Sequence, residues 1–282
     1  MKKIIREVDE KKQIVQVTIA DERWYLKPAK DEEGLPYIKG VPSVTWISSS
    51  YPKGIAFYKW LADKGWDEAE AIKQAAGTKG SKVHLAIANI LSGEEVRIDS
   101  KFENKETGQM EELTLEECDC ILSFKAWFEA VKPKVIAWES AIFSDQYNYA
   151  GTIDLICEID GEYWVVDFKT GQYIWPEYEL QVSAYRRAIE NGENTFTEIK
   201  DYSKIKTAIL QIGYRRNKNA YKFTEVEDKF ALFQAAQVIW KNEHGDETPD
   251  YKTYPVVLSP ALKPKDVVAE PKAKRVKKDA AN

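Results

Sequence analysis

The sequence has few cysteines and no long hydrophobic run, and both absences narrow the class of protein. Its three cysteines form no CxxC pair and are too few for a disulfide framework, which indicates a reducing compartment. They are also too few for a four-cysteine zinc or iron–sulfur site. No apolar run approaches the roughly 18 residues of a membrane span. The N-terminus turns charged at once and lacks a signal-peptide core. We therefore expect a cytoplasmic protein.

An excess of positive charge is also missing. The formal net charge is -5, so any binding of nucleic acid would need a local basic patch. Hydrophobic residues make up 44% of the chain, enough for a sizeable core. Shifts in composition predict a β-rich N-terminal extension (1–40), a main domain (41–256) and a disordered basic tail (257–282). The tail is either a solubilising terminus or a weak nucleic-acid tether.

The most informative stretch is a hairpin over residues 149–170. Two apolar strands flank Asp160-Gly161, a strong two-residue turn signal. With that turn the numbers of opposing residues sum to about 321, which sets Asp154 opposite Asp167 with Lys169 on the same face. Opposed carboxylates destabilise a sheet unless a cation compensates, and carboxylate oxygens bind divalent cations well. The pattern therefore predicts a metal site with a lysine beside it.

A third carboxylate depends on the preceding turn. Residues 135–143 are expected to form a strand that leads into the hairpin. A two- or four-residue turn gives opposing numbers that sum to about 291, so that Glu139 faces Thr152, diagonal to Asp154 and on its side of the sheet. A three-residue turn would place Glu139 on the other face.

Several helices are predicted around this hairpin. Gly80-Ser81 suits a helix start, and His84 lies at the edge of the apolar stripe that follows. Thr114 and Glu117 form a capping box before a helix that runs to about residue 131. Pro176 marks entry to a helix over 177–191, on which Gln181 and Tyr185 share a face one turn apart. Residues 93–112 are expected to be a loop, 205–214 a strand and 228–243 a further helix.

The order and content of these motifs resemble the PD-(D/E)XK nucleases of the RecB-like branch. That branch includes CRISPR-associated exonucleases and mitochondrial genome maintenance exonucleases. The matching segments cover roughly 41–215: Gly80-Ser-Lys-Val-His84, Gly151-Thr-Ile-Asp154, Val166-Asp167-Phe-Lys169-Thr-Gly and Gln181-Val-Ser-Ala-Tyr185. The proline of the Pro-Asp dipeptide is replaced by Ile153. The resemblance implies an α/β restriction-endonuclease-like core of order α-β-β-β-α-β, with helices flanking a mixed sheet.

The resemblance also implies a chemistry. His84, Asp154 and Asp167, with Glu139 if it faces the site, would bind Mg²⁺ or Mn²⁺, which polarises the scissile phosphate and acidifies water. Imidazole suits softer ions, so Mn²⁺ should be tolerated. Lys169 would position the attacking water and stabilise phosphoryl charge. Gln181 and Tyr185 would contact the substrate backbone, order the lysine or simply pack. No iron–sulfur cluster is expected.

The implied function is DNA exonuclease activity on free ends, with preference for single strands. Arg186, Arg187, Arg215 and Arg216 are the candidate substrate-binding residues. A structure-specific endonuclease and a non-catalytic DNA-binding subunit remain alternatives. A stand-alone nuclease of phage or bacterial recombination or repair, with replication or recombination proteins as partners, fits the resemblance.

Overall fold

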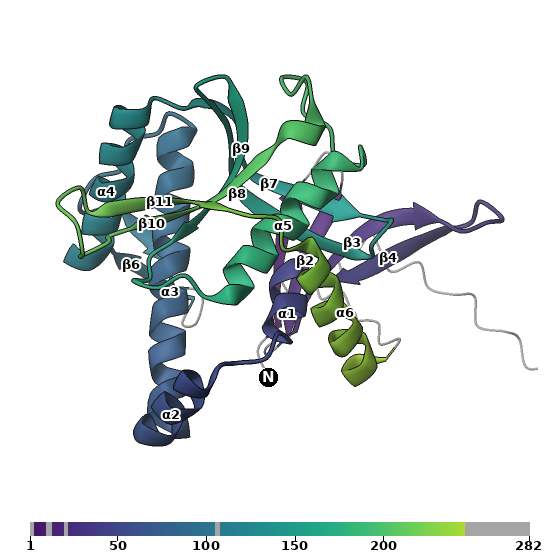
Figure 1. The fold of residues 1–282 in the computed structure, drawn as a ribbon, viewed down its shortest axis with the longest axis horizontal. Helices are drawn as coiled ribbons and strands as arrows, with labels where there is room; N and C mark the ends of the chain where they lie inside the picture. Colours follow the sequence, from purple (N-terminus) through teal and green to yellow (C-terminus); the bar gives the residue numbers. More distant parts are fainter. Residues whose placement is uncertain (1–2, 10–12, 20–21, 105–107, 246–282) are drawn as a thin grey trace, which may run out of the picture. The chain divides into compact units, whose positions relative to one another are not determined.

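We analysed a computed structural model that describes residues 3–9, 13–19, 22–104 and 108–245, and the predicted basic tail lies outside them. All described residues belong to one compact unit, Met1–Thr248. Its chain order places an N-terminal sheet first, then three helices, then the main sheet with its covering helices (Figure 1). Among the described residues no helix is long and apolar enough to cross a bilayer.

The N-terminal part is a four-stranded antiparallel meander, as the β-rich prediction requires. Its strands are β1 (Lys3–Asp9), β2 (Ile14–Ile19), β3 (Glu22–Lys30) and β4 (Pro36–Pro42). Tyr25 anchors it to the main sheet, because its buried hydroxyl lies 3.0 Å from Thr152 Oγ1. A second anchor is the edge-on packing of Trp24 against Trp46 and Trp240. The meander is therefore part of the same packed body as the main sheet.

The helices before the main sheet are α1 (Val44–Ser49), α2 (Ile55–Lys64) and α3 (Trp66–Leu91). The prediction that a helix starts at Gly80-Ser81 is wrong, because α3 runs unbroken through Gly77 and Gly80. A glycine inside a helix costs only about 1 kcal/mol relative to alanine. A Cβ at Gly80 would lie 4.0 Å from Thr170 Oγ1, so the helix passes close to the end of the hairpin there. The predicted loop over 93–112 also contains a small ribbon, β5 (Lys101–Glu103) and β6 (Met110–Glu112).

The main sheet has five strands in the order β11-β10-β9-β8-β7. The β9–β10 pair is parallel and the others are antiparallel, which makes the sheet mixed. The strands are β7 (Lys134–Ser144), β8 (Tyr149–Ile159), β9 (Glu162–Lys169), β10 (Lys206–Ile212) and β11 (Tyr221–Val226). A short 3-10 helix, η1 (Tyr202–Lys204), precedes β10.

Helices cover both faces of this sheet (Figure 1). On one face α3 and α4 (Leu115–Val131) pack over β8, β9 and β10 around buried Phe124, Trp127 and Leu155. On the other, α5 (Pro176–Glu190) packs Val182 against Ile209 and Val226, and α6 (Phe230–His244) packs against α5 and α1. This is the α/β core with a mixed, helix-flanked sheet that the resemblance implied. Thr114 and Glu117 form the predicted capping box.

The hairpin has the predicted register but opens earlier than expected. Pairs from Ile159↔Glu162 to Leu155↔Val166 follow the predicted sum of 321. The pairing then stops one step short of Asp154 and Asp167, so these two are not a cross-strand pair. Beyond this point β9 continues along β10 and β8 along β7, and Ala150 of β8 also forms a parallel bridge with Ser43. The two strands therefore form a fork at the two aspartates.

Candidate metal and phosphodiesterase site

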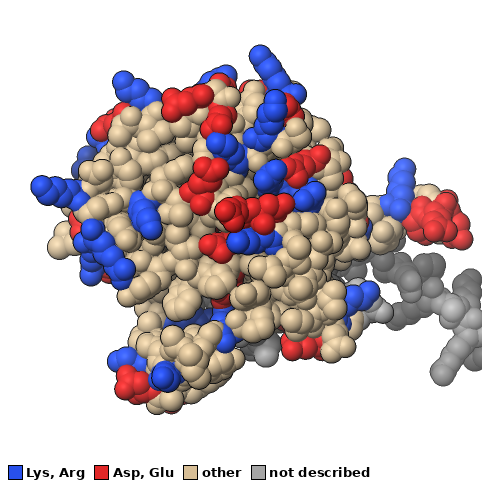
Figure 2. Space-filling view, in the orientation of Figure 1, with Lys and Arg blue, Asp and Glu red and all other residues tan. Residues whose placement is uncertain are grey.

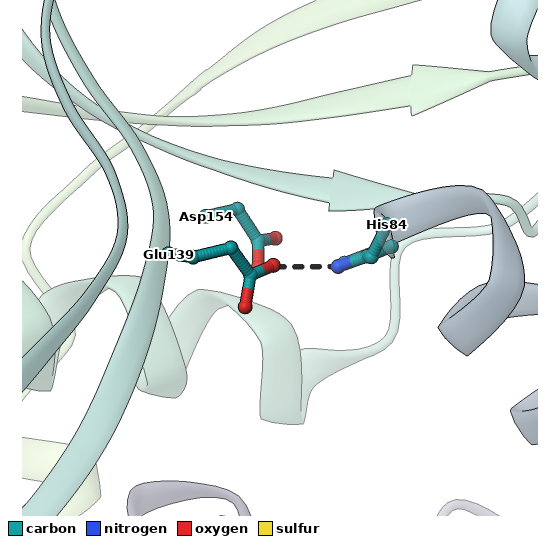
Figure 3. Close-up of side chains that lie close together, drawn as sticks. All are labelled: His84, Glu139 and Asp154. Carbon is teal, nitrogen blue, oxygen red and sulfur yellow. Dashed lines mark ion pairs between the residues drawn. The ribbon is translucent and has the colours of Figure 1, made fainter. Parts of the chain in front are cut away.

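Three potential metal ligands meet at the fork. His84 comes from α3, Glu139 from β7 and Asp154 from β8, and one ligand atom of each lies within 4.8 Å of the other two (Figure 3). Asp154 is buried and the other two are half-buried. One imidazole nitrogen and two carboxylates in a small, partly enclosed space form a set of donors that suits a divalent cation.

The histidine ring is held by two contacts. Its Nε2 lies 3.1 Å from the carbonyl oxygen of Phe168, and its Nδ1 lies 3.2 Å from Asp154 Oδ1. A carbonyl only accepts, so Nε2 carries the proton that it donates to Phe168. Nδ1 is then the nitrogen that faces the carboxylates and is free to bind a cation. Burial lowers the pKa of His84, but the adjacent Asp154 outweighs it, and the net pKa shift is upward.

Glu139 lies on the same side of the sheet as Asp154, as predicted for an even-numbered turn between the two strands. The β7–β8 connection has four residues (145–148), an even number. From Ser144↔Tyr149 to Trp138↔Leu155 the opposing numbers sum to 293, not 291. Glu139 and Asp154 are not themselves a ladder pair, but they lie between the pairs Trp138↔Leu155 and Ser140↔Ile153. Glu139 therefore lies opposite Asp154 and not diagonal to it, which corrects the predicted register. Its backbone has φ 44°, the left-handed region, which is costly for a residue with a side chain.

Asp167 and Lys169 form a second group beside the first. Lys169 Nζ lies 2.5 Å from Asp167 Oδ2. Burial raises the pKa of Asp167 to about 6, with Lys169 opposing the shift and the Asp154 charge adding to it. For Lys169, burial lowers the pKa, but the carboxylates of Asp167 and Asp154 outweigh it and hold the pKa above its ordinary value. Burial is therefore the main reason that Asp167 holds its proton more tightly than a free carboxyl group does.

Helix α5 supplies the polar side chains that hold this group. Gln181 Nε2 donates to Asp167 Oδ1 at 2.8 Å and lies 2.9 Å from Tyr185 Oη, while Gln181 Oε1 accepts from Lys169 at 3.3 Å. Tyr185 is buried, and its ring occupies the space that a Cβ at Gly151 would need, 2.5 Å from Cε1. The sequence interpretation missed Tyr178, whose ring centroid lies 4.5 Å from Lys169 Nζ. Its spacing of three residues from Gln181 on one helix was the available signal.

The four candidate arginines are not equivalent. Arg186 Nε pairs with Glu190 at 2.6 Å, and Arg187 pairs with Asp228 at 3.3 Å and lies over the Phe230 ring. On the β10–β11 turn, exposed Arg215 pairs with Glu116 at 2.7 Å. The fourth, Arg216, lies over the Tyr173 ring. On the face drawn in Figure 2, Lys and Arg side chains alternate with Asp and Glu side chains.

The residues present fit a divalent ion. His84, Glu139 and Asp154 provide one nitrogen and two carboxylate ligands. With Asp167, the site holds three carboxylates beside one ammonium and one imidazole group, and a divalent ion would balance their charge. Asp167 itself is not one of the three clustered ligands, and its carboxylate contacts Gln181 and Lys169.

A family model for the PD-(D/E)XK nuclease superfamily matches residues 55–257, more than half of the chain. The chain therefore belongs to the PD-(D/E)XK nuclease superfamily, whose members are metal-dependent nucleases. No curated protein matches the chain closely enough to be reported as a relative.

Proposed function

We propose that this chain is a RecB-like exodeoxyribonuclease that uses Mg²⁺ or Mn²⁺ to hydrolyse phosphodiester bonds from free DNA ends, with a preference for single strands. The observation that carries the proposal is the gathering of His84, Glu139 and Asp154 within 4.8 Å, beside a lysine held by Asp167. Recombination or repair in a bacterium or phage is the process that fits such an activity.

His84 Nδ1 and the carboxylates of Glu139 and Asp154 would hold the ion, with Asp167 close enough to add negative charge. The bound ion supplies Lewis acidity that polarises the scissile phosphate and acidifies the attacking water. The Phe168 carbonyl fixes the histidine ring so that Nδ1 keeps facing the carboxylates. This part of the site is therefore assembled before substrate arrives, which lowers the cost of reorganisation.

Lys169 would act on the substrate directly. Its ammonium group, held by Asp167 and Gln181, can donate hydrogen bonds to phosphoryl oxygens or to the attacking water. Gln181 and Tyr185 would act through it as positioning residues: Gln181 bridges Asp167 and Lys169, and buried Tyr185 fixes Gln181. Tyr185 is too enclosed to touch DNA. Arg216 is the better candidate for a phosphate contact, because its guanidinium lies over the Tyr173 ring, whereas acidic partners engage Arg186, Arg187 and Arg215.

The test compares linear and circular DNA. Linear single and double strands, labelled at either end, and a covalently closed circle are incubated with the protein and Mg²⁺ or Mn²⁺. We expect the linear forms to be degraded, single strands faster, and the circle to be spared; the labelled end that is released first gives the polarity. Lys169→Ala should lose activity, and Lys125→Ala, on the exposed face of α4, should keep it. A cut circle would indicate an endonuclease, and tight binding without any cleavage would indicate a non-catalytic DNA-binding subunit.

A further inference from the structure

The loop that joins β9 to α5 displays two aromatic rings to solvent. It begins directly after Lys169, and its Tyr173 and Trp175 are 59% and 45% exposed. Their ring centroids lie 6.5 Å apart, with the planes tilted by 48°. One exposed aromatic residue needs no explanation, but two neighbouring rings on a loop that starts at the proposed catalytic lysine form a surface to which an apolar, planar group can bind.

The residues that flank the two rings anchor the loop to the rest of the protein. Gln172 Nε2 donates to the Gly213 carbonyl at 2.9 Å, and Gln172 Oε1 accepts from the backbone N–H of Arg215 at 2.9 Å. Ile174 is turned the other way and packs against the cluster of Val182, Ile209 and Val226. At the end of the loop the Trp175 carbonyl accepts from the Tyr178 N–H, the first turn of α5. The outward positions of Tyr173 and Trp175 are therefore set by anchored neighbours, and little ordering is needed on binding.

A cation completes the arrangement. The guanidinium carbon of Arg216 lies 4.6 Å from the Tyr173 ring centroid. An arginine that lies over an aromatic ring still has N–H groups at the edge of its guanidinium plane, where a phosphate can accept hydrogen bonds from them. Rings for bases and a guanidinium for phosphate are the two elements of sites that bind single-stranded nucleic acid.

We propose that Tyr173, Trp175 and Arg216 form a base-stacking platform that holds unpaired nucleotides of the DNA strand whose phosphate lies at Lys169. This inference rests on the proposed nuclease function and names the residues that would make the site prefer single strands. In the interior of a duplex the faces of the bases are covered by their neighbours, so a ring can stack only on bases that are unpaired or terminal. The loop is short and starts at Lys169, so the stacked bases would belong to nucleotides next to the scissile bond.

The first test measures binding apart from cleavage. In the full-length Lys169→Ala protein, the affinity for a fluorescent single-stranded oligonucleotide is measured by anisotropy, with and without Tyr173→Ala or Trp175→Ala. We expect each truncation to weaken binding about tenfold, and Tyr173→Phe and Trp175→Phe to retain it. Tyr37→Ala is the matched control, because Tyr37 is 46% exposed and belongs to β4 of the N-terminal sheet. A covalently closed duplex circle should bind equally to all variants.

The second test uses the substrate. Oligonucleotides that each lack one base are then compared. We look for a position where the missing base weakens binding to the Lys169→Ala protein but not to the same protein carrying Trp175→Ala. Such a position would identify the stacked nucleotide. If both alanine variants bind the intact single strand as the parent does, the platform does not exist, even if the protein is a nuclease. If Lys169→Ala cleaves as fast as the wild type, the proposed mechanism fails, while the binding arm still decides the platform. Equal losses on single-stranded and closed duplex DNA would overturn base stacking in favour of general phosphate binding.

Discussion

The carboxylate of Asp154 accepts a hydrogen bond from the backbone N–H of Phe168, 2.7 Å away, at the fork between β8 and β9. The β8 backbone has left the ladder there, so the side chain supplies the acceptor that a strand would otherwise provide. Asp154 therefore has a structural task besides its place among the candidate ligands. Its pKa reflects both: burial raises it, but His84, Lys169 and the Phe168 N–H outweigh burial and hold it below its ordinary value.

The two tasks of Asp154 can be separated with variants that both lack its charge. Asp154→Asn keeps an oxygen that can accept from Phe168, whereas Asp154→Leu has a similar shape and no acceptor. Both should be inactive as nucleases, but the leucine variant should be less stable by about 1–3 kcal/mol, because it leaves a buried N–H unpaired. Urea unfolding in EDTA measures the difference. Equal stabilities would mean that water or a backbone shift replaces the bond.

Binding of a divalent ion should stabilise the folded protein. His84, Glu139 and Asp154 offer three ligand atoms within 4.8 Å of one another, and an ion that binds only the folded state adds about 2.7 kcal/mol at a hundred times its Kd. The rise in Tm with Mg²⁺ or Mn²⁺ should disappear in Glu139→Gln and in His84→Gln. Glu158→Gln, on the same strand as Asp154 but paired with Lys134, is the control that should keep it. A full thermal shift in Glu139→Gln would remove Glu139 from the ion site.

Gly151 is expected to be intolerant of even one added carbon. A Cβ there would lie 2.5 Å from Tyr185 Cε1, so the ring that positions Gln181 would have to move. Gly151→Ala should destabilise the protein by roughly 1–3 kcal/mol and reduce kcat with little change in KM. In a double-mutant cycle, adding Tyr185→Ala should cost less in the Gly151→Ala background than in the wild type. Strict additivity would show that the ring and the glycine do not interact.

The sequence predicted those features that depend on local signals. Asp160-Gly161 determined the hairpin register, and the spacing of Gln181 and Tyr185 correctly placed them on one face. The fork was not predictable, because strand separation depends on which neighbours compete for each edge. The unbroken helix through Gly80 was missed for a related reason: tertiary packing outweighs a small intrinsic cost. The ion pairs of the two arginines on α5 were also missed. Arg186 pairs with Glu190 one helical turn away, and Arg187 pairs with Asp228, which only the tertiary packing brings close. Composition alone does not distinguish such paired arginines from arginines that bind DNA.

The docking of the N-terminal sheet should depend weakly on pH through Asp145. Lys27 and Lys39 both pair with this carboxylate, at 2.5 and 2.7 Å. Burial raises the pKa of Asp145, but the two ammonium groups outweigh it and the net pKa shift is downward. A carboxyl group whose pKa is lower in the folded protein than in the unfolded chain stabilises the fold above the unfolded pKa of about 3.9. This stabilisation is lost as the pH falls through the folded pKa.

Asp145→Asn should therefore destabilise the protein at pH 7, by at most about 1 kcal/mol because the carboxylate is half exposed. The difference from the wild type should shrink below about pH 5 and also in high salt. Urea unfolding of both proteins across pH 7 to 3.5 provides the measurement. A difference that is constant over this range would assign the effect to something other than charge.

Glu139 is expected to trade stability for function. Its left-handed backbone (φ 44°) is free for glycine but costs other residues about 1–2 kcal/mol, and strain of this kind is typical of functional positions. In EDTA, Glu139→Gly should therefore be more stable than Glu139→Ala by roughly 0.5–1 kcal/mol, after the greater unfolded-state entropy of glycine is included. At the neighbouring Ser140, which pairs with Ile153 in the ladder, the same comparison should have the opposite sign, since glycine weakens an ordinary strand position. Both Glu139 variants should lose the stabilisation by Mg²⁺, and both Ser140 variants should keep it. A glycine at position 139 that is no more stable than alanine would mean that the backbone there relaxes without the glutamate, and that the side chain, through its contacts in the site, imposes the conformation.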